Sequence, residues 1–460
     1  MKHIHLIGIG GTGLSAIARV LIETGYTVSG SDRDMSPLAE DIACLGASVY
    51  QGHNSKNIAG ANTIIYSSAI PSDNPEIIAA HEQNIPLYKR SEFIGRLMEG
   101  KHCIAIAGTH GKTTTTAMVA WLLKALEKDP SYIIGGVARN LGNNAHAGKD
   151  KLFVIEADEY DHMFLGLQPD FITVTNIEHD HPDCFPTVND YHQAFTDFIN
   201  QLKVGGKLLV CVDDEITEKI ARTALPKVST FLTYGLDDNA NYHAVDLRVN
   251  DAGGFSFSLI YDGTNDSNNS LAHVDLSIPG KHNVQNAVAA LAIIHELDLP
   301  VQKAANALKE FVGTGRRFEK LGEVNGILVV DDYGHHPTEI HATLSAARSC
   351  YPDRRIWAVW QPHTYTRTQS LSDRFIASLQ LADRVIVTEV YAAREKNDHY
   401  SSKNIVDKMA DKNVTFVSKF KDAETYLLEN LESNDLLIVL SAGNANQISA
   451  NVLKQLQEQK

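Results

Sequence analysis

The sequence predicts an α/β protein whose parallel sheets are covered by helices. The chain has 460 residues, which at roughly 150 residues per domain corresponds to about three domains. Short apolar runs rich in β-branched residues alternate with amphipathic stretches, as in HIHLIGIG followed by LSAIARVLIETG, or HCIAIAG followed by TTTTAMVAWLLKALE. This alternation is typical of strand–helix–strand units and therefore of parallel sheets.

Two turn-rich joints indicate where the domains meet. Met98–Lys101 and Val312–Gly315 each precede a new strand or motif. We therefore expect three domains, over residues 1–100, 101–314 and 315–460. In the middle domain, the alternation of Gly254–Leu259 predicts an antiparallel extension, and the polar residues 262–270 are predicted to form its hairpin loop.

The composition is that of an ordinary globular protein. Lys plus Arg is 41 and Asp plus Glu is 56, and the resulting net charge of −15 argues against general binding to nucleic acid or to an anionic membrane. The five cysteines form no CxxC or zinc spacing and suit a reducing compartment. We find no export signal at the start and no apolar run of bilayer-spanning length, so we expect a cytoplasmic protein.

A glycine-rich turn near the N-terminus predicts a diphosphate site. Gly8–Gly13 follows the first apolar run and opens a helix, and Asp32 ends the next strand. Glycines at this position let the backbone approach a diphosphate at the helix N-terminus, and an acid at this spacing often meets a ribose hydroxyl. The pattern alone fits NAD, FAD or a UDP-sugar.

A second loop, Gly108–Thr114, predicts an ATP site. It lies between the strand CIAIA and a helix, and it reads Gly-Thr-His-Gly-Lys-Thr-Thr. Its backbone amides and Lys112 would hold phosphates, and the Thr113 hydroxyl would reach Mg²⁺. Position 106 is Ile rather than the Gly of the strict P-loop pattern, so we expect a loop that is shorter at its front.

Acidic and imidazole side chains follow two further strands of the middle domain. Glu156–Glu159 ends the strand LFVIEADE, and Asn176–Asp183 follows the strand FITVTNI. Carboxylates with one imidazole suit a Mg²⁺ ion that bridges substrate phosphates. Zinc is an alternative because His179 and His181 lie near acids, but a third nitrogen or sulfur ligand is missing from the pattern.

Polar residues also follow apolar strands in the last third of the chain. Arg316 and Arg317 precede a strand that ends in Asp331–Glu339, and a later strand leads into Gln361–Thr368. Open α/β sheets bind ligands at this edge. An arginine there can stabilise charge during phosphoryl transfer, and Arg367 can pair with a carboxylate substrate through two parallel hydrogen bonds.

Together these motifs resemble those of the Mur ligase family, the ATP-dependent amide-forming enzymes of peptidoglycan synthesis, over essentially the whole chain. The motifs GIGGTGLSAIA, SSAI followed by Asn74-Pro75-Glu76, GTHGKTTTT, RRFE, DDYGHHPTEI and QPHTYTRT are most similar to the branch that joins L-alanine to UDP-N-acetylmuramate. The resemblance implies a Rossmann-like N-terminal domain without nicotinamide, a central P-loop ATPase-type domain with a mixed sheet, and a Rossmann-like C-terminal domain.

The resemblance also implies roles for individual residues, each at a position that matches a family motif. The UDP-sugar and acceptor substrates would be bound by Gly10, Gly11, Asp32, His53, Ser68, Ala69, Asn144, His363 and Arg367. ATP would be bound by Gly108, Thr109, His110, Gly111, Lys112, Thr113, Thr114, Asn283, Asn286, Arg317 and Asp332. The metal ligands would be Thr113, Glu159 and His181, and the catalytic residues would be Lys112, His181, His335, His336 and Arg367.

The implied substrates are UDP-N-acetylmuramate, L-alanine and ATP, with Mg²⁺, in a monomer or weak homodimer. The muramyl carboxylate would attack the γ-phosphate while Mg²⁺, Lys112 and Arg317 neutralise charge. The amino group would then attack the acyl phosphate after a base, such as a histidine of the third domain, has taken its proton. Closure of the third domain would complete the site and exclude water.

Three departures from the family pattern leave the acceptor open. Tyr160 stands in DEYD where the alanine-adding branch has Ser, and this form resembles the relative that attaches the tripeptide L-Ala-γ-D-Glu-meso-diaminopimelate during wall recycling. Leu440–Asn446 replaces an expected Gly-Ala-Gly-Asp motif, and Ala393–Asn397 differs from the usual Ala-Gly-Glu form. Glycine, L-serine or a peptide therefore stay alternatives to L-alanine.

Two other classes of function are also considered. An NAD-dependent oxidoreductase would use Gly8–Gly13 but would leave the Gly-Lys-Thr-Thr loop and the acidic clusters without a purpose. A non-catalytic ATP-binding regulator is disfavoured because Lys112, Thr113, Glu159 and His181 are all present.

Overall fold

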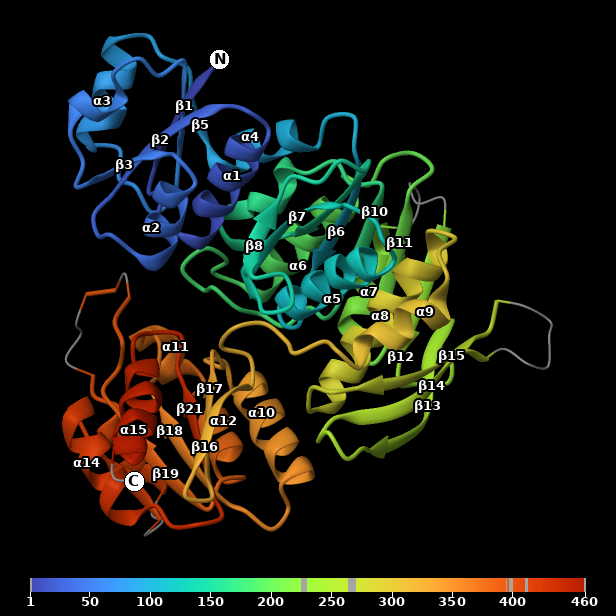
Figure 1. The fold of residues 1–460 in the computed structure, drawn as a ribbon, viewed down its shortest axis with the longest axis vertical. Coiled ribbons are helices and arrows are strands. Elements are labelled where there is room, and N and C mark those ends of the chain that lie inside the picture. Colours follow the sequence, from blue (N-terminus) through green and yellow to red (C-terminus); the bar gives the residue numbers. More distant parts are fainter. Residues whose placement is uncertain are drawn as a thin grey trace. The chain divides into compact units, whose positions relative to one another are not determined.

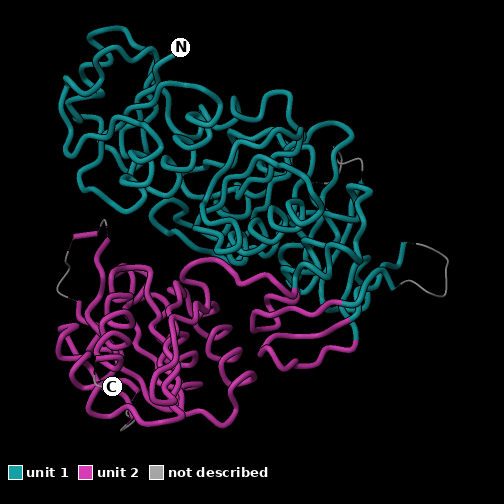
Figure 2. The backbone as a smooth tube through the Cα atoms, viewed as in Figure 1, with its two compact units in different colours: residues 1–245, 258–273, 285–308 teal, residues 246–257, 274–284, 309–460 magenta. Residues whose placement is uncertain are grey.

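The computed structural model describes residues 2–224, 230–263, 270–393, 395–396, 400–409 and 413–458. Three sheets flanked by helices occupy these residues, which confirms the predicted α/β class (Figure 1). The chain divides into two compact units, and Figure 2 colours them: the first comprises residues 1–245, 258–273 and 285–308, and the second comprises residues 246–257, 274–284 and 309–460. The N-terminal sheet and most of the central sheet therefore share one unit.

The N-terminal sheet is parallel throughout, with the order β3-β2-β1-β4-β5. Its strands are β1 (His3–Ile7), β2 (Thr27–Asp32), β3 (Ser48–Gln51), β4 (Thr63–Tyr66) and β5 (Leu87–Lys89). Its helices are α1 (Thr12–Glu23), α2 (Pro37–Cys44), α3 (Pro75–Glu82) and α4 (Arg90–Ile94), with 3₁₀ turns η1 (Ser55–Ile58) and η2 (Gly95–Met98). Strand order reverses between β1 and β4, and ligands bind at such a switch point in open α/β sheets.

The central sheet is mixed, as predicted, and has the order β15-β14-β13-β12-β11-β10-β6-β9-β7-β8. Its core strands β6, β9, β10 and β11 pair in parallel, whereas β7 and β8 are antiparallel. The strands are β6 (His102–Ala107), β7 (Ser131–Ala138), β8 (Asn143–His146), β9 (Leu152–Glu156), β10 (Phe171–Val174), β11 (Lys207–Cys211), β12 (Thr230–Gly235), β13 (Tyr242–Val249), β14 (Phe255–Tyr261) and β15 (Ser270–Leu276).

In the described residues of this central part, helices and a 3₁₀ segment flank the sheet. They are α5 (Lys112–Ala125), η3 (Tyr160–Gly166), α6 (Val188–Ile199), α7 (Glu215–Ala224), α8 (Lys281–Glu296) and α9 (Val301–Leu308). The predicted hairpin loop at 262–270 connects β14 to β15, and its residues 264–269 lie outside the described part of the chain. Among the described residues, none of the helices has both the length and the apolar character needed to cross a membrane.

The C-terminal sheet has the order β16-β17-β21-β18-β19-β20 and is parallel except for the β16–β17 hairpin. Its strands are β16 (Glu319–Val324), β17 (Ile327–Asp332), β18 (Arg355–Trp360), β19 (Arg384–Val387), β20 (Val414–Phe416) and β21 (Asp435–Leu440). Its helices are α10 (Pro337–Cys350), α11 (Tyr365–Ser370), α12 (Ser372–Leu379), α13 (Lys403–Met409), α14 (Phe420–Asn430) and α15 (Asn446–Glu458).

Successive residues of β17 enter different hydrophobic clusters. Val330 belongs to the cluster on one face of the sheet, and Val329 belongs to the cluster on the other. Because adjacent strand residues point to opposite faces, both faces of this sheet are covered. Because both faces are buried, the strands have continuous apolar sequences. Polar side chains are accommodated at the carboxyl edge of the sheet instead.

Close backbone packing joins the two sheet regions of the first unit. A Cβ atom on Gly166 would lie 1.9 Å from the carbonyl oxygen of Ser91, and one on Gly95 would lie 2.6 Å from the carbonyl oxygen of Gly166. Asn144 of β8 is buried and donates to the carbonyl oxygen of Thr12 at 3.2 Å. The start of α1 is thereby held beside the central sheet.

Candidate active site

The loop between β6 and α5 has a backbone that requires glycine. Gly108 has φ +133°, and a Cβ there would lie 2.0 Å from Oγ1 of Thr175. Gly111, which precedes α5, is left-handed with φ +84°. Asn176 accepts from the amide of His110 at 2.9 Å through its side chain. The chain after β10 therefore holds the loop in a shape that side chains at the two glycines would disrupt.

The ammonium group of Lys112 lies at the centre of this loop. It donates to the carbonyl oxygens of Gly108 and Thr109, and it lies 2.8 Å from Oε2 and 3.1 Å from Oε1 of Glu159. Burial disfavours the charge, but the carboxylates of Glu159 and Glu156 outweigh burial and raise the pKa of Lys112 above its ordinary value. The site therefore keeps a cation beside two carboxylates.

Thr113 contacts Glu156, an acid to which the family motifs assign no individual role. Its hydroxyl donates to Oε1 of Glu156 at 3.0 Å, and the amide of Gly135 donates to Oε2 at 2.6 Å. Burial raises the pKa of Glu156, although Lys112 opposes part of that rise. Glu156 ends β9 within the predicted acidic cluster, but its pairing with Thr113 joins β9 to the start of α5 and has no signature in the local sequence.

Glu159 and His181, the two predicted metal ligands from the acidic clusters, lie close together. Glu159 is 2% exposed, and its Oε1 is 3.8 Å from Nε2 of His181 and 3.4 Å from the hydroxyl of Tyr191. The ring of Tyr160 packs edge-on against His181 with 5.1 Å between centroids, and its hydroxyl donates to Asp183 at 3.0 Å. Tyr160 and Tyr191 thus support the acidic cluster, a role that the sequence does not indicate.

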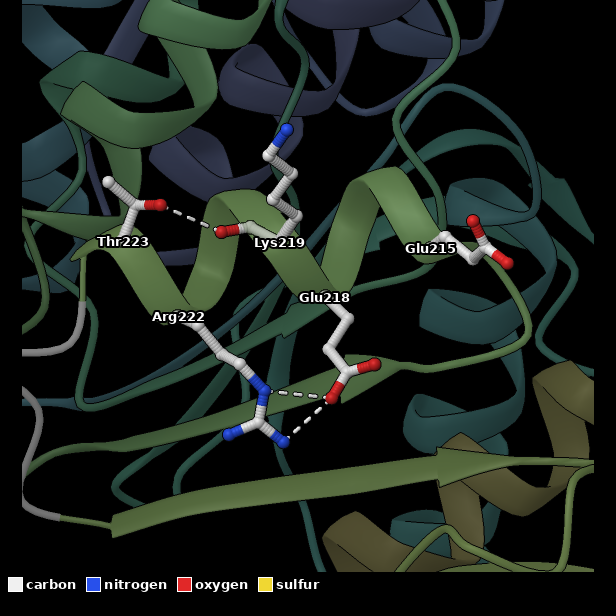
Figure 3. A pocket seen from close by; sticks show the side chains of 5 residues that line it. All are labelled: Glu215, Glu218, Lys219, Arg222 and Thr223. Atoms are coloured by element: carbon white, nitrogen blue, oxygen red, sulfur yellow. Dashed lines mark hydrogen bonds and ion pairs between the residues drawn. The ribbon is translucent and has the colours of Figure 1, made fainter.

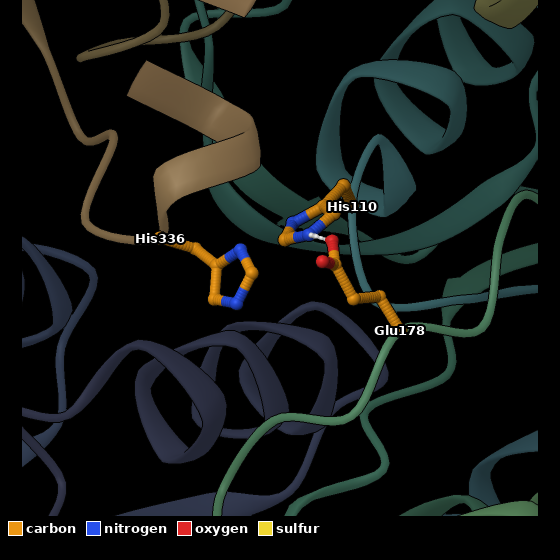
Figure 4. Close-up of side chains that lie close together, drawn as sticks. All are labelled: His110, Glu178 and His336. Atoms are coloured by element: carbon orange, nitrogen blue, oxygen red, sulfur yellow. Dashed lines mark hydrogen bonds and ion pairs between the residues drawn. The ribbon is translucent and has the colours of Figure 1, made fainter. Parts of the chain in front are cut away.

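The other histidines of this region have protein partners. Nε2 of His110 lies 3.0 Å from a carboxylate oxygen of Glu178 (Figure 4). Nε2 of His179 lies 2.8 Å from the carbonyl oxygen of Phe185 and must donate to it. A protonated nitrogen cannot ligate a metal, so this contact counts against the zinc alternative at that atom.

The N-terminal loop is also shaped by glycine and by a carboxylate. Gly8 has φ +91°, and the amide of Gly10 donates to Oδ2 of Asp32 at 2.8 Å. A Cβ on Gly10 would lie 2.8 Å from Oγ of Ser36. Asp32 therefore positions the loop that opens α1, in addition to the ribose contact that the sequence predicts for it. Gly11 is the residue that precedes α1.

Ser68 and Ala69 are exposed in the turn after β4. That turn lies beside the first loop, because a Cβ on Gly8 would approach Cβ of the neighbouring Ser67 to 3.2 Å. The structure therefore brings the β1 and β4 turns together at the switch point, where the sequence predicts the UDP-sugar.

Arg90 is a site residue that sequence reasoning missed. Its guanidinium lies against Gly13, where a Cβ would come within 1.9 Å of Nη1, and its Nη2 lies 2.8 Å from Oδ2 of Asp158. Burial raises the pKa of Asp158, but Arg90 and Lys112 outweigh it, so the pKa is lowered. Arg90 belongs to no glycine-rich or acidic motif, and only the fold brings it between the two loops.

His53 lies on a buried carboxylate of the N-terminal domain. Its Nδ1 is 3.2 Å from Oε2 of Glu76, which is fully buried and also accepts from Ser31 at 2.5 Å and from Asn57 at 2.6 Å. Burial favours the protonated acid, but the His5 ring 3.9 Å away and the hydrogen bonds from Ser31 and Asn57 hold the pKa of Glu76 at about 2.

The two asparagines predicted to face adenine lie at the start of α8. Asn283 donates to the carbonyl oxygen of Pro279 at 2.6 Å. Asn286 lies next to the phosphate loop, since a Cβ on Gly111 would come within 2.7 Å of its Oδ1. Both side chains are buried, and the adenine contact itself stays a prediction.

In the second unit, Asp332 and Arg317 both have partners within the fold. Asp332 ends β17 and accepts from the amides of Phe318 and Gly334, each at 2.7 Å. Arg317 lies 3.1 Å from a carboxylate oxygen of Glu339, and the charges of Glu339 and Asp332 outweigh burial and raise its pKa. The carboxylate of Asp332 thus shapes the turn that carries Arg317.

Three of the predicted acceptor residues gather at the carboxyl edge of the C-terminal sheet. The rings of His335 and His363 are 5.6 Å apart, and Nδ1 of His363 is 3.3 Å from Nη1 of Arg367. Arg367 is 5% exposed. His336 is fully buried and caps α10, so the structure places it as a helix cap, and its predicted role towards the acceptor stays untested.

Each of the two unusual C-terminal motifs, Leu440–Asn446 and Ala393–Asn397, makes hydrogen bonds to the segment Gln361–Thr366. Ser441 donates to Oε1 of Gln361 at 2.7 Å, and Nε2 of Gln361 donates to Asn444 at 2.9 Å. Glu395 accepts from the backbone amides of Tyr365 and Thr366 at the start of α11. Arg394 and Asn397 of the second motif lie outside the described residues.

A shallow surface pocket lies away from these motifs, along α7. Its lining consists of Glu215, Glu218, Lys219, Arg222 and Thr223, and a 2.8 Å hydrogen bond joins Arg222 to Glu218 (Figure 3). The pocket is a solvated helix face that carries none of the predicted site residues.

A phosphate loop with a buried lysine beside carboxylates, on parallel strands, defines the class of P-loop nucleotide-binding proteins. Within that class, three family models match most of the chain: "Mur ligase family, catalytic domain" over residues 3–102, "Mur ligase middle domain" over 106–294, and "Mur ligase, glutamate ligase domain" over 316–443. The chain belongs to the Mur ligase family.

Curated relatives match over the full length. A UDP-N-acetylmuramate–L-alanine ligase of Syntrophus aciditrophicus is 39% identical, covering 100% of this chain and 94% of that protein. One of Neisseria meningitidis is 41% identical, covering 99% of this chain and 98% of that protein.

Solved structures agree with these relatives. The UDP-N-acetylmuramate–alanine ligase of Thermotoga maritima has a TM-score of 0.85 at 28% identity, with both chains fully covered. A murein peptide ligase of Psychrobacter arcticus has a TM-score of 0.73 at 27% identity, with 99% of each chain covered. The three-domain α/β fold predicted from the sequence is confirmed.

The depressed pKa of Glu76 predicts a specific response to acid. A carboxylate with pKa about 2 in the folded state and 4.5 in the unfolded state contributes stability above pH 4.5, at most about 3 kcal/mol, and loses it as the pH falls through 2. Thermal unfolding of wild type and Glu76→Gln should therefore differ most near neutral pH, and the difference should shrink below pH 4.5. A difference that stays constant down to about pH 2.5 contradicts the assignment.

Proposed function

We propose that this chain is an ATP-dependent ligase that joins L-alanine to UDP-N-acetylmuramate in peptidoglycan synthesis. The observation that carries the proposal is full-length identity of 39–41% to curated UDP-N-acetylmuramate–L-alanine ligases. Family membership also favours it over an NAD-dependent oxidoreductase or a regulator without catalysis. The match to murein peptide ligases keeps the tripeptide as the alternative acceptor.

The phosphate loop supplies the groups that ATP requires. The ammonium of Lys112 would exchange its contacts with the loop carbonyls for oxygens of the β- and γ-phosphates, and the first backbone amides of α5 would donate to the same phosphates. Asn283 and Asn286 are proposed for the adenine. In the second unit, Arg317 is proposed to stabilise charge on the transferred phosphoryl group, and Asp332 to contact the ribose.

A magnesium site at Thr113, Glu159 and His181 fits this arrangement. Buried Glu159 lies between Lys112 and His181, and a carboxylate, a hydroxyl and one imidazole are donors that suit a hard cation bridging phosphates. Bound there, Mg²⁺ would neutralise phosphate charge. Glu156, which holds the Thr113 hydroxyl, would orient that donor.

The chemistry proceeds through activation of a carboxylate. The lactyl carboxylate of the UDP-sugar attacks the γ-phosphorus of ATP, the bond to ADP breaks, and an acyl phosphate forms. The amine of L-alanine, once deprotonated by a base, attacks the carbonyl carbon, and phosphate leaves. His335, His363 and Arg367 lie together and are proposed to orient the amino acid, with a histidine of this domain, His335 or His336, as the base.

The UDP-sugar is proposed to bind along the carboxyl edge of the N-terminal sheet. Gly10 and Gly11 present the start of α1 to the diphosphate, and Asp32 and His53 lie towards the nucleoside end. Ser68, Ala69 and Asn144 complete the predicted set. Arg90, which lies against the start of α1, is an additional cation at this edge.

The domain boundaries, location and assembly state are also proposals. Domains over 1–100, 101–314 and 315–460 are supported by the family matches, which begin and end near the same joints. A cytoplasmic location is supported by five cysteines that are all free thiols and by the use of ATP. A monomer or weak homodimer is proposed.

Phosphate release from ATP and Mg²⁺ with UDP-N-acetylmuramate tests the proposal, with L-alanine, glycine, L-serine and the tripeptide as acceptors and mass spectrometry of the product. We expect turnover that favours L-alanine and a product heavier by one alanine residue. Turnover only with the tripeptide would show a ligase of cell-wall recycling instead, the function that Tyr160 in the DEYD motif indicates. No turnover with any acceptor would overturn the muramyl-ligase assignment.

The role of Lys112 predicts a large loss of activity in Lys112→Met, which removes the ammonium and keeps part of the stem. We expect kcat for phosphate release to fall by about 10³-fold, because the developing phosphate charge loses its nearest cation. Lys219→Met is the matched control, since Lys219 is exposed on α7, and it should keep activity within about twofold. A folded Lys112→Met protein with near wild-type kcat would rule out this role.

A further inference from the structure

Glu76 stands where hydrogen-bond donors converge from several elements of the N-terminal domain. Oε1 accepts from Nδ2 of Asn57 at 2.6 Å and from the amide of Asn54 at 3.3 Å. Oε2 accepts from the hydroxyl of Ser31 at 2.5 Å and faces Nδ1 of His53 at 3.2 Å. Glu76 is fully buried at the start of α3, so these groups, rather than water, satisfy it.

The hydrogen-bond partners of His53 determine which of its ring nitrogens carries the proton. The single hydroxyl proton of Ser31 is donated to Glu76, so the Ser31 oxygen that lies 3.0 Å from Nδ1 of His53 must accept. The carboxylate of Glu76 is also an acceptor. Two acceptors facing Nδ1 require a proton on Nδ1. In the neutral ring, Nε2 then carries a lone pair and can only accept.

The position of His53 in the sheet points to the nucleoside end of the proposed UDP-sugar site. His53 follows β3, and the amide of Gly52 donates to the carbonyl oxygen of Asp32 at the end of β2 at 2.7 Å. The glycine loop for the diphosphate follows β1, on the far side of β2 in the order β3-β2-β1. The side chain of His53 is 20% exposed, and within the described residues its hydrogen-bond contacts are all made by Nδ1.

We propose that Glu76 is a positioning residue that keeps the proton of His53 on Nδ1, so that Nε2 accepts a hydrogen bond from a donor of the uridine half of the substrate. The donor is uracil N3–H or a ribose hydroxyl, because these are the donors of the uridine half, and the diphosphate offers only acceptors. The inference rests on the proposed function, in that it takes the ligand of this edge to be a UDP-sugar. It adds a specificity role for a residue that does not touch the substrate.

Glu76→Gln tests the mechanism because it places one amide NH₂ among four donors. The backbone amide of Asn54 cannot reverse its role, whereas Ser31 can rotate its hydroxyl and His53 can move its proton. The new NH₂ should therefore face Ser31 and His53, and the His53 proton should move to Nε2. Ser31→Ala is the matched control, since it removes a partner of Nδ1 but leaves the carboxylate of Glu76 in place.

Two measurements report the change. Nitrogen-15 NMR of the imidazole at about pH 8.5 should show the Nδ1–H form in wild type and Ser31→Ala, and the Nε2–H form in Glu76→Gln. In the assay, Glu76→Gln should raise KM for UDP-N-acetylmuramate by roughly tenfold or more, with kcat and the KM values for ATP and L-alanine within about twofold of wild type. Replacing a residue that is needed only for folding would not raise the KM for UDP-N-acetylmuramate while leaving the other kinetic constants unchanged.

Nucleotide analogues identify the donor in the wild-type protein, so the test does not depend on a variant that folds. Competitive inhibition by UDP is compared with that by CDP, 3-methyl-UDP, 2′-deoxy-UDP and 3′-deoxy-UDP. A base donor predicts roughly tenfold weaker inhibition by CDP and 3-methyl-UDP, and a recovery of CDP in Glu76→Gln, because cytosine N3 is an acceptor. A ribose donor predicts weaker inhibition by one of the deoxy compounds instead.

The outcomes separate this inference from the proposed function. Equal inhibition by all five nucleotides, or an Nε2–H ring in wild type, overturns the role of Glu76 while turnover with UDP-N-acetylmuramate stands. The role of Glu76 is also overturned if the His53 proton moves to Nε2 in Glu76→Gln but the KM for UDP-N-acetylmuramate stays unchanged. Wild-type protein that neither binds UDP nor turns over UDP-N-acetylmuramate overturns the proposed function, and the inference with it.

Discussion

The buried ammonium of Lys112 is the constraint on which the active-site region depends. A cation this close to the protein interior needs counter-charges, and Glu159 contacts it with both carboxylate oxygens while Glu156 adds a second negative charge. Glu156 ends β9 and Glu159 follows it, and Lys112 opens the helix that follows β6, the strand paired with β9 in parallel. The sheet register therefore decides the electrostatics, and the positive-φ glycines of the loop let the ammonium reach the backbone carbonyls.

Carboxylates at strand ends shape loops in the first and the last sheet. Asp32 ends β2 and accepts from the amide of Gly10, and Asp332 ends β17 and accepts from the amides of Phe318 and Gly334. In each case the acid fixes a backbone turn at the carboxyl edge of a sheet, where ligands bind in α/β proteins. An acid that a sequence motif predicts to contact a substrate can thus also stabilise the binding loop through hydrogen bonds to its backbone amides.

Much of this arrangement can be predicted from the sequence because its signals are local. The strand–loop–helix pattern around Lys112, the acids after β9 and the alternating runs are each contained in a few neighbouring residues, and the α/β fold was confirmed. Arg90 and Tyr191 were missed, as was the pairing of Glu156 with Thr113, because the residues of each pair lie 32 to 68 positions apart in the sequence. Only the tertiary fold, which packs α4, α5 and α6 against the ends of the strands, brings such pairs together. Glu76 appeared in a motif, but its burial among donors has no local pattern.

We propose that this chain activates a carboxylate by phosphoryl transfer. Single turnover with ATP, L-alanine and UDP-N-acetylmuramate labelled with oxygen-18 in both oxygens of the lactyl carboxylate tests it most directly, with mass spectrometry of the released phosphate. We expect one oxygen-18 atom in each phosphate, because the oxygen that attacks phosphorus leaves with it when the amide forms. Phosphate without oxygen-18, released together with an amide product, would contradict an acyl-phosphate intermediate.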